Sequence, residues 1–177
     1  MSLLLEQWRT RWLETDRRWA CELHRVAEHP RVLRVLVTAS RLGEGELWYA
    51  VMVGLLLGGA SAWTCALQML CVGGLNLLIY RQIKHRVCRP RPYVKCPEIH
   101  ACDRALDEFS FPSGHTLHAV SFALLMTFHF PLCAAFLWLF ALTVAASRVV
   151  LGLHYPSDVA AGALTGAFTA SLALLAW

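Results

Sequence analysis

The sequence predicts an all-α integral membrane protein: a helical bundle with about five transmembrane helices, preceded by amphipathic N-terminal helices. Hydrophobic residues make up 57% of the 177 positions. Charged residues make up only 16%, against roughly 25% in an average soluble domain. The apolar residues gather in segments of helix length, and the charges are confined to the stretches between them. Lipid is therefore the expected solvent of most of the chain.

The first 44 residues are predicted to form an amphipathic interfacial region, distinct from a membrane-embedded domain at residues 45–177. Apolar residues recur at helical spacing through residues 3–28, and arginines and acids fill the other positions. Trp and Arg on opposite sides are typical of a helix that lies flat in a membrane interface. A helix packed on the protein's own body would show the same pattern. Pro30 breaks this helix, and residues 31–42 form a second short amphipathic piece.

Five apolar segments follow, each near the length of about 20 residues that a helix needs to cross a bilayer core. They run over residues 47–62, 63–80, 115–130, 131–150 and 159–177. Glycine and other small residues are frequent in them, which lets membrane helices approach closely. Gln68 and Asn76 lie inside the second segment, and we expect them to bond to neighbouring helices.

The charged residues are expected on one face of the membrane. All 16 Lys and Arg lie before residue 47, between residues 81 and 104, or at Arg148. When the five helices are threaded back and forth, these positions fall at the same end, together with the acidic residues. The net charge of +4 is too small to indicate a nucleic-acid partner. The lipid bilayer is the partner that the composition predicts.

Three short motifs carry the polar residues of that face. The first, KHRVCRPRP, covers residues 84–92, just past the second apolar segment. The second, PSGH, opens the third segment at residues 112–115, and the third, SRVVLGLHYPSD, links the last two segments at residues 147–158. Taken singly, the basic residues would serve as interfacial anchors and the histidines as structural residues. Taken together, the motifs place three cations, two histidines and a carboxylate on one membrane face.

This combination suits a multiply charged oxyanion. Arginines supply paired hydrogen bonds, a lysine supplies a point charge, and unpaired N–H groups at a helix start attract anions. Phosphoryl transfer also needs a nucleophile and an acid for the leaving group, and two histidines can divide those roles. Asp158, bonded to one nitrogen of His154, would orient the ring so that the other nitrogen attacks. The same two residues, four apart, could instead form a capping pair.

The three motifs resemble the signature of the type 2 phosphatidic acid phosphatases, in the superfamily shared with bacterial acid phosphatases, glucose-6-phosphatase and vanadium haloperoxidases. That signature reads K-x6-R-P, P-S-G-H and S-R-x5-H-x3-D. The chain matches all three parts, in order and at the right internal spacing, from Lys84 to Asp158. The resemblance covers roughly residues 45–177 and leaves the N-terminal region without a match.

The resemblance implies a metal-independent phosphatase that works through a covalent phosphohistidine. His154 corresponds to the nucleophile, and Asp158 to the residue that orients it. His115 corresponds to the general acid, which protonates the leaving oxygen and later activates water. No cofactor and no metal are expected, because fixed cations take the role that Mg²⁺ plays in other phosphoryl transferases.

The resemblance also implies which residues bind the phosphate. Lys84, Arg91 and Arg148 correspond to a clamp of three cations, which Ser113 and the N–H group of Gly114 complete. The predicted reaction is hydrolysis of a phosphomonoester or diphosphate on a lipid headgroup. Phosphatidic acid, phosphatidylglycerol phosphate and an undecaprenyl-type diphosphate all fit as the lipid phosphate substrate.

A non-catalytic membrane protein that binds anionic lipid headgroups is the alternative, since basic residues at one interface would suit it. It leaves the two histidines and Asp158 unexplained. The resemblance places the protein in a bacterial inner membrane, with its site on the outer, periplasmic face. The arginines before residue 47 argue for the cytoplasmic face under the positive-inside rule.

Cys96 and Cys102, with His100 between them, permit two further interpretations. Their spacing is irregular for a zinc site. A disulfide between them would require an oxidising compartment. We expect free thiols.

Overall fold

The computed structural model describes residues 2–176, and the side chains of residues 5–176. Within that part of the chain the secondary structure is helical, which confirms the all-α prediction. In chain order the elements are α1 (Ser2–His24), the 3-10 helix η1 (Arg25–Glu28), α2 (Pro30–Leu42), α3 (Glu46–Leu55), α4 (Ala60–Val87), α5 (Pro92–Lys95), α6 (Gly114–His129), the 3-10 helix η2 (Pro131–Cys133), α7 (Ala134–Val150) and α8 (Pro156–Ala176).

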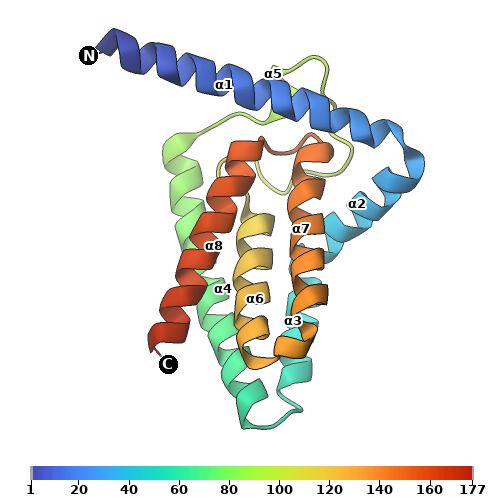
Figure 1. The fold of residues 1–177 in the computed structure, drawn as a ribbon, viewed down its shortest axis with the longest axis vertical. Helices are drawn as coiled ribbons and strands as arrows, with labels where there is room; N and C mark the ends of the chain where they lie inside the picture. Colours follow the sequence, from blue (N-terminus) through green and yellow to red (C-terminus); the bar gives the residue numbers. More distant parts are fainter. Residues whose placement is uncertain (1, 177) are drawn as a thin grey trace.

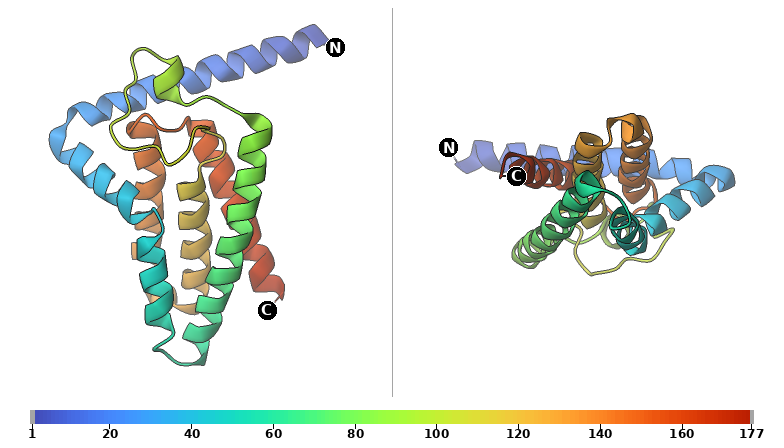
Figure 2. Two further views of the ribbon diagram at one scale, coloured as in Figure 1. Left: turned by 180° about the vertical axis from the view of Figure 1, so that it is seen from behind. Right: turned by 90° about the horizontal axis from the view of Figure 1, so that it is seen from below.

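The longer helices after α2 stand side by side as a bundle, and α1 lies across one end of it (Figures 1 and 2). Helix α6 is central, because it packs against α4, α7 and α8. Apolar side chains from α3, α4, α6 and α7 fill the bundle, with Trp48, Met69, Phe122, Leu125 and Val144 among them. The connection between α4 and α6 lies over the same end as α1 (Figure 2).

Among residues 2–176, three helical segments are long and apolar enough to cross a membrane: α4, α7 together with η2, and α8. Helix α3 is apolar but has only 10 residues, and α6 has 16. The count of five therefore stays a prediction. The predicted boundaries of the first two segments were wrong. The first helix, α3, ends at Leu55, and α4 begins at Ala60 and continues to Val87, with Lys84 in its last turn. The polar residues after Tyr80 are good helix formers, so the helix does not end where the apolar run does.

Helices α6 and α8 lie in close contact because α8 has glycine where the two helices meet. A Cβ atom on Gly166 would lie 2.2 Å from the carbonyl oxygen of Leu117, and one on Gly162 would lie 2.5 Å from that of Ser113. The N–H of Ser113 also donates to the carbonyl of Asp158 at 3.0 Å. The start of α6 is thereby joined to the start of α8, which brings the second motif to the third.

Gln68 and Asn76 of α4 bond to other helices, as predicted. Asn76 donates to the Ser121 hydroxyl at 3.0 Å and accepts from the Thr169 hydroxyl at 2.8 Å. The side-chain oxygen of Gln68 lies 2.8 Å from Nε2 of His129. These bonds tie α4 to α6 and α8 inside an otherwise apolar bundle, where an unpaired amide would be costly.

The N-terminal region forms the two predicted helices, separated by η1, and Pro30 occupies the first position of α2. Helix α1 is buried against the bundle at Asp16 and Ala20. Its large apolar side chains remain between 44% and 65% exposed at Leu5, Trp8, Trp12, Leu13, Trp19 and Leu23. One side of the helix thus packs on the protein's own body, and its large apolar side chains are left exposed on the other sides. Its residence in the membrane interface stays a prediction.

The connection at residues 88–113 is held down by backbone bonds. Pro90 and Phe109 form an antiparallel bridge, and the N–H of Ser110 donates to the carbonyl of Arg89 at 2.8 Å. The first motif is thereby fixed beside the residues that precede the second. All seven cysteines are free thiols in the structure, including Cys96 and Cys102 in this connection.

Candidate active site

A cavity of about 610 Å³ lies where the three motifs meet. The side chains of Lys84, Arg91, His115, Arg148 and His154 line its polar end. They come from α4, the connection after it, α6, α7 and the loop before α8. The tertiary structure therefore brings together the two histidines and the three cations that the sequence singled out.

The short loop between α7 and α8 places His154. Gly152 has a φ of +74°, and a Cβ there would lie 2.6 Å from the carbonyl oxygen of His100. A side chain at this position would be strained and would clash. Beyond the turn, the N–H groups of Leu153 and His154 both donate to the carbonyl of Arg148, at 3.2 and 3.0 Å. The loop thus folds back on the end of α7 and holds His154 beside Arg148.

The two nitrogens of the His154 ring face different groups. Nε2 lies 3.3 Å from a guanidinium nitrogen of Arg91, on the side of the cations. Nδ1 lies 3.7 Å from Oδ2 of Asp158, which is fully buried behind the ring. That oxygen also accepts the N–H of Tyr155 at 2.8 Å, so Asp158 caps α8 as well as facing the histidine.

Burial lowers the pKa of His154 well below its ordinary value of 6.5, and the neighbouring cations Arg148, Arg91 and Lys84 lower that pKa further. The ring is therefore neutral near pH 7, which leaves one nitrogen with a free electron pair. With the proton on Nδ1, toward Asp158, the free pair is on Nε2 and points to the cations. This is the arrangement of a poised nucleophile.

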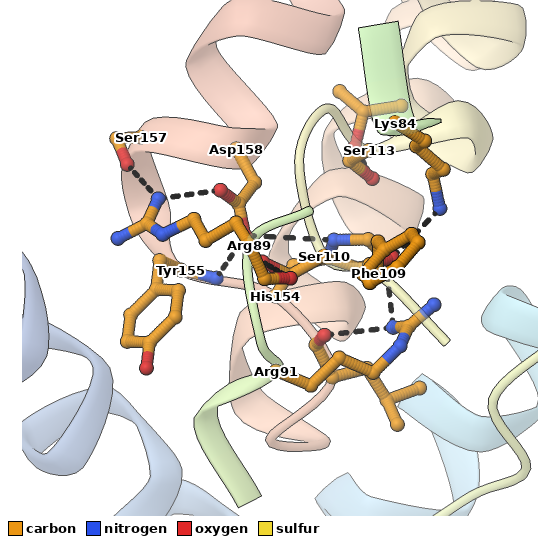
Figure 3. A network of polar contacts seen from close by, with 12 residues as sticks. Lys84, Arg89, Arg91, Phe109, Ser110, Ser113, His154, Tyr155, Ser157 and Asp158 are labelled. Carbon is orange, nitrogen blue, oxygen red and sulfur yellow. Dashed lines mark hydrogen bonds and ion pairs between the residues drawn. The ribbon is translucent and has the colours of Figure 1, made fainter. Parts of the chain in front are cut away.

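Asp107 joins two of the predicted cations, and the sequence reasoning missed it. The Lys84 ammonium lies 2.6 and 2.7 Å from its two carboxylate oxygens, and Arg91 lies 2.8 Å from one of them. Lys84 also donates to the carbonyl of Phe109 at 2.9 Å (Figure 3). The available signal was an acid between the first and second motifs, a few residues ahead of the second.

Five polar atoms on side chains that line the cavity are buried without a hydrogen-bond partner among the described residues: Nε of Arg148, Nε2 of His115, Nδ1 of His154, Nε1 of Trp48 and Oε1 of Glu44. Another nitrogen of Arg148 donates to the hydroxyl of Ser40, which α2 contributes. Leaving a buried donor unpaired costs about 1–3 kcal/mol, so such atoms are usually satisfied in the functional state. An oxyanion bound beside the cations would satisfy Nε of Arg148 and Nε2 of His115.

Ser113 and Gly114 differ in where they lie. Gly114 lines the cavity and starts α6, so its N–H group is one of the unpaired groups at a helix start. Ser113 is fully buried, and its hydroxyl lies 3.0 Å from that of Thr116. A direct contact between Ser113 and phosphate stays a prediction.

Arg89 is the second residue that the sequence reasoning missed. It lies in the first motif between Lys84 and Arg91, but its side chain reaches the start of α8 (Figure 3). Its guanidinium lies 2.6 Å from Asp158 and 2.7 Å from Asp16 of α1. The repeated Arg-Pro of the first motif was the only sequence signal for it.

The three motifs and their geometry correspond to a known class of membrane enzymes. A sequence profile of the PAP2 superfamily matches residues 65–177, so the chain belongs to that superfamily. Together with three helices that can cross a bilayer, this makes it an integral membrane protein.

Two named relatives are similar in sequence. The bacitracin transport permease protein BcrC of Bacillus licheniformis is 40% identical over 81 residues, which cover 45% of this chain and 39% of that protein. YbjG of Escherichia coli K12, which carries the name of an undecaprenyl-diphosphatase, is 31% identical over 104 residues, covering 58% of this chain and 52% of that protein. The chain therefore matches only about two fifths to one half of the length of these relatives.

Two solved structures share the fold. LpxE of Aquifex aeolicus superposes with a TM-score of 0.77 at 25% identity, over 87% of this chain and 93% of that one. A transmembrane PAP2-type phosphatidylglycerolphosphate phosphatase from Bacillus subtilis superposes with a TM-score of 0.73 at 24% identity, over 93% of this chain and 85% of that one. The second likeness is one of fold alone.

We expect Asp107→Asn to destabilise the protein near neutral pH and to matter less in acid. Burial raises the pKa of Asp107, but the ion pairs with Lys84 and Arg91 outweigh it, and the net effect lowers that pKa. A carboxyl group whose pKa is lower in the folded than in the unfolded state stabilises the fold at pH values above its ordinary pKa, near 4. This stabilisation is lost as the pH falls through the folded-state pKa. The measurement is the thermal unfolding midpoint of both proteins in nonionic detergent between pH 7 and pH 3.

The matched control is Glu108→Gln, which removes the neighbouring carboxylate, outside the ion pairs with Lys84 and Arg91. The gap between wild type and Asp107→Asn should be largest at pH 7 and close in acid. A gap that stays constant over the whole range would contradict the ion-pair explanation.

Proposed function

We propose that the chain is a metal-independent lipid phosphatase that hydrolyses a phosphomonoester or diphosphate through a phosphohistidine at His154. The observation that carries this proposal is the orientation of the His154 ring. Its Nε2 atom faces the cations and its Nδ1 atom faces the buried Asp158, at 3.3 and 3.7 Å. A general lipid-binding site has no need of a neutral histidine aligned in this way.

In the first step, Nε2 of His154 attacks phosphorus, and the bond from phosphorus to the leaving oxygen breaks. Burial and the nearby cations lower the pKa of His115 to about 2, so the acid is the imidazolium formed when the bound phosphate brings a proton and compensating negative charge. His115 gives this proton to the leaving oxygen, and the lipid product leaves as an alcohol or a monophosphate. In the second step, water attacks phosphorus, the phosphorus–nitrogen bond breaks, and His115 takes a proton from the water. The negative charge of Asp158 stabilises the positive charge that the His154 ring acquires.

The charge balance of the cation cluster beside His154 fits a phosphate dianion. Lys84, Arg91 and Arg148 supply three positive charges, and Asp107 supplies one negative charge in return. Two positive charges therefore remain for the ligand. In a buried site such fixed charges stabilise the transition state without a metal ion. The exposed Asp107 is already engaged by Lys84, and the buried Asp158 is already engaged by Arg89.

The shape of the cavity supports a lipid substrate. Away from the cations it is lined by apolar side chains of α3, α4 and α6, including Trp48, Met52, Leu70, Leu77 and Phe122. A headgroup phosphate on the cations would leave the lipid chain along this apolar wall. Phosphatidic acid, phosphatidylglycerol phosphate and an undecaprenyl-type diphosphate are the substrates to compare, and the name of the E. coli protein supports the last of them.

We expect His154→Ala to lower phosphate release from a short-chain lipid phosphate by about 10⁴-fold or more, because the nucleophile is lost. Wild-type activity should survive EDTA and be inhibited by vanadate, which mimics the transferring phosphoryl group. The assay is phosphate release in detergent, with His29→Ala, an exposed histidine of the N-terminal region, as the matched control. Activity within tenfold of wild type would remove His154 from this role. Loss in EDTA that Mg²⁺ or Zn²⁺ restores would overturn metal independence.

We expect His115→Ala to cost more with a lipid phosphate than with p-nitrophenyl phosphate. A general acid contributes about 10²–10⁴-fold and matters most when the leaving oxygen is basic. Nitrophenolate leaves without a proton, so its release should depend less on His115. The measurement is the ratio of the two activities in wild type and variant. Equal losses on both substrates would make His115 a phosphate-binding or structural residue.

We propose that the site faces the outer, periplasmic side of a bacterial inner membrane. The resemblance to bacterial lipid phosphatases supports this orientation, and the cations of the site are tied to phosphate rather than to topology. The arginines of α1 and α2 oppose it under the positive-inside rule. Two exposed cysteines mark the two ends of the bundle: Cys88 follows α4 at the site, and Cys133 ends η2 at the far end.

In spheroplasts, a membrane-impermeant maleimide should label Cys88 and leave Cys133 unlabelled. Each cysteine is tested as the only one in the chain, and permeabilised membranes, in which both should react, serve as the control. The reverse pattern would place the site in the cytoplasm.

A further inference from the structure

Arg89 connects the catalytic carboxylate to helix α1. One guanidinium nitrogen donates to Oδ1 of Asp158 at 2.6 Å and to the hydroxyl of Ser157 at 2.7 Å. The other donates to Oδ2 of Asp16 at 2.7 Å. The guanidinium carbon lies 3.9 Å from the centre of the Tyr155 ring, so the arginine is stacked as well as bonded (Figure 3). One planar side chain therefore bridges two carboxylates that are 142 residues apart in sequence.

Asp16 is more than a surface partner of this arginine. It is only 4% exposed, and its Oδ1 atom accepts the N–H of Ser157 at 3.0 Å. Its Oδ2 atom accepts the Ser157 hydroxyl in addition to Arg89. The carboxylate thus binds the first turn of α8, where a negative charge is favourable. In sequence it interrupts the apolar side of α1, four residues after Trp12 and three before Trp19.

The charges of the three residues explain what Asp16 adds. Asp158 alone with Arg89 would form a neutral pair, which offers little to a histidine that becomes positive. With Asp16 as a second carboxylate, the group carries one net negative charge. Arg89 still fixes Oδ1, while Oδ2 is held toward His154 by the N–H of Tyr155. The bridge therefore fixes the Asp158 side chain without cancelling its charge.

We propose that Asp16 of α1 is a positioning residue for catalysis, which acts through Arg89 to hold and polarise Asp158 against His154. The proposal rests on the proposed function, in which Asp158 stabilises the charge that forms on His154. It assigns a catalytic role to α1, which lies outside the residues that match the PAP2 profile. Asp16 does not line the cavity, so substrate binding should be nearly independent of it.

The test is a double-mutant cycle of Asp16→Asn and Arg89→Lys, with kcat and KM measured on a lipid phosphate. Asp16→Asn keeps the shape and removes the charge. It should lower kcat about 10- to 100-fold, a usual range for coupled buried groups, and leave KM within about twofold. Arg89→Lys keeps the charge but loses the planar guanidinium whose two nitrogens bond to different carboxylates, so it should lower kcat similarly. In the Arg89→Lys background, Asp16→Asn should add less than about twofold.

Glu14→Gln is the matched control, because it removes an exposed carboxylate from the same helix. It should leave both constants unchanged. A kcat for Asp16→Asn equal to that of Glu14→Gln would overturn the proposal, and so would a loss of equal size with and without Arg89. If Asp16→Asn does not fold in detergent, the Arg89→Lys variant serves as the test by itself. An unchanged kcat in that variant would also overturn the proposal. Failure of the proposed function is a separate result, because His154→Ala would then remain active.

Discussion

The pairing of buried charges at one end of an apolar bundle is the constraint on which the rest of this structure depends. An ion in a poorly solvated interior is costly unless an opposite charge and hydrogen bonds compensate it. Lys84 and Arg91 share Asp107, and Arg89 lies between Asp16 and Asp158. These pairs determine where the α4–α6 connection runs and why α1 lies across the bundle end.

At the cavity, some of the buried polar groups lack a partner in the part of the chain that the structure describes, and these unpaired groups form the candidate binding site. Arg148 is buried at the end of α7 beside the hydroxyl of Ser40, and one of its nitrogens has no hydrogen-bond partner among the described residues. His115 has an unpaired ring nitrogen in the same surroundings. An excess of positive charge beside unpaired donors favours an anion, and the apolar wall beyond it favours one attached to a lipid.

A few features of the helical bundle bring the side chains of the site together. Glycines at the α6–α8 contact bring the second and third motifs close together at one end of the bundle. The positive φ of Gly152 turns the chain so that His154 lies next to Arg148. Asn76 joins α4 to both neighbouring helices. If Asp16 acts as proposed, the N-terminal helix also belongs to the catalytic unit, although it lies outside the matched superfamily region.

The sequence by itself determined the helical class, the membrane setting and the residues of the three motifs, because hydropathy and motif spacing are local properties of the chain. It misplaced the end of α4, since helix propensity carries that helix beyond its apolar run to Lys84. Only the tertiary structure decided the partners of the motif residues: Asp107 for Lys84, Ser40 for Arg148 and Asp16 for Arg89. The reason is physical. A buried charge pairs with whichever opposite charge or hydrogen-bonding group the packing brings within about 3 Å. Neither the distance along the chain nor the residue type predicts which group that is.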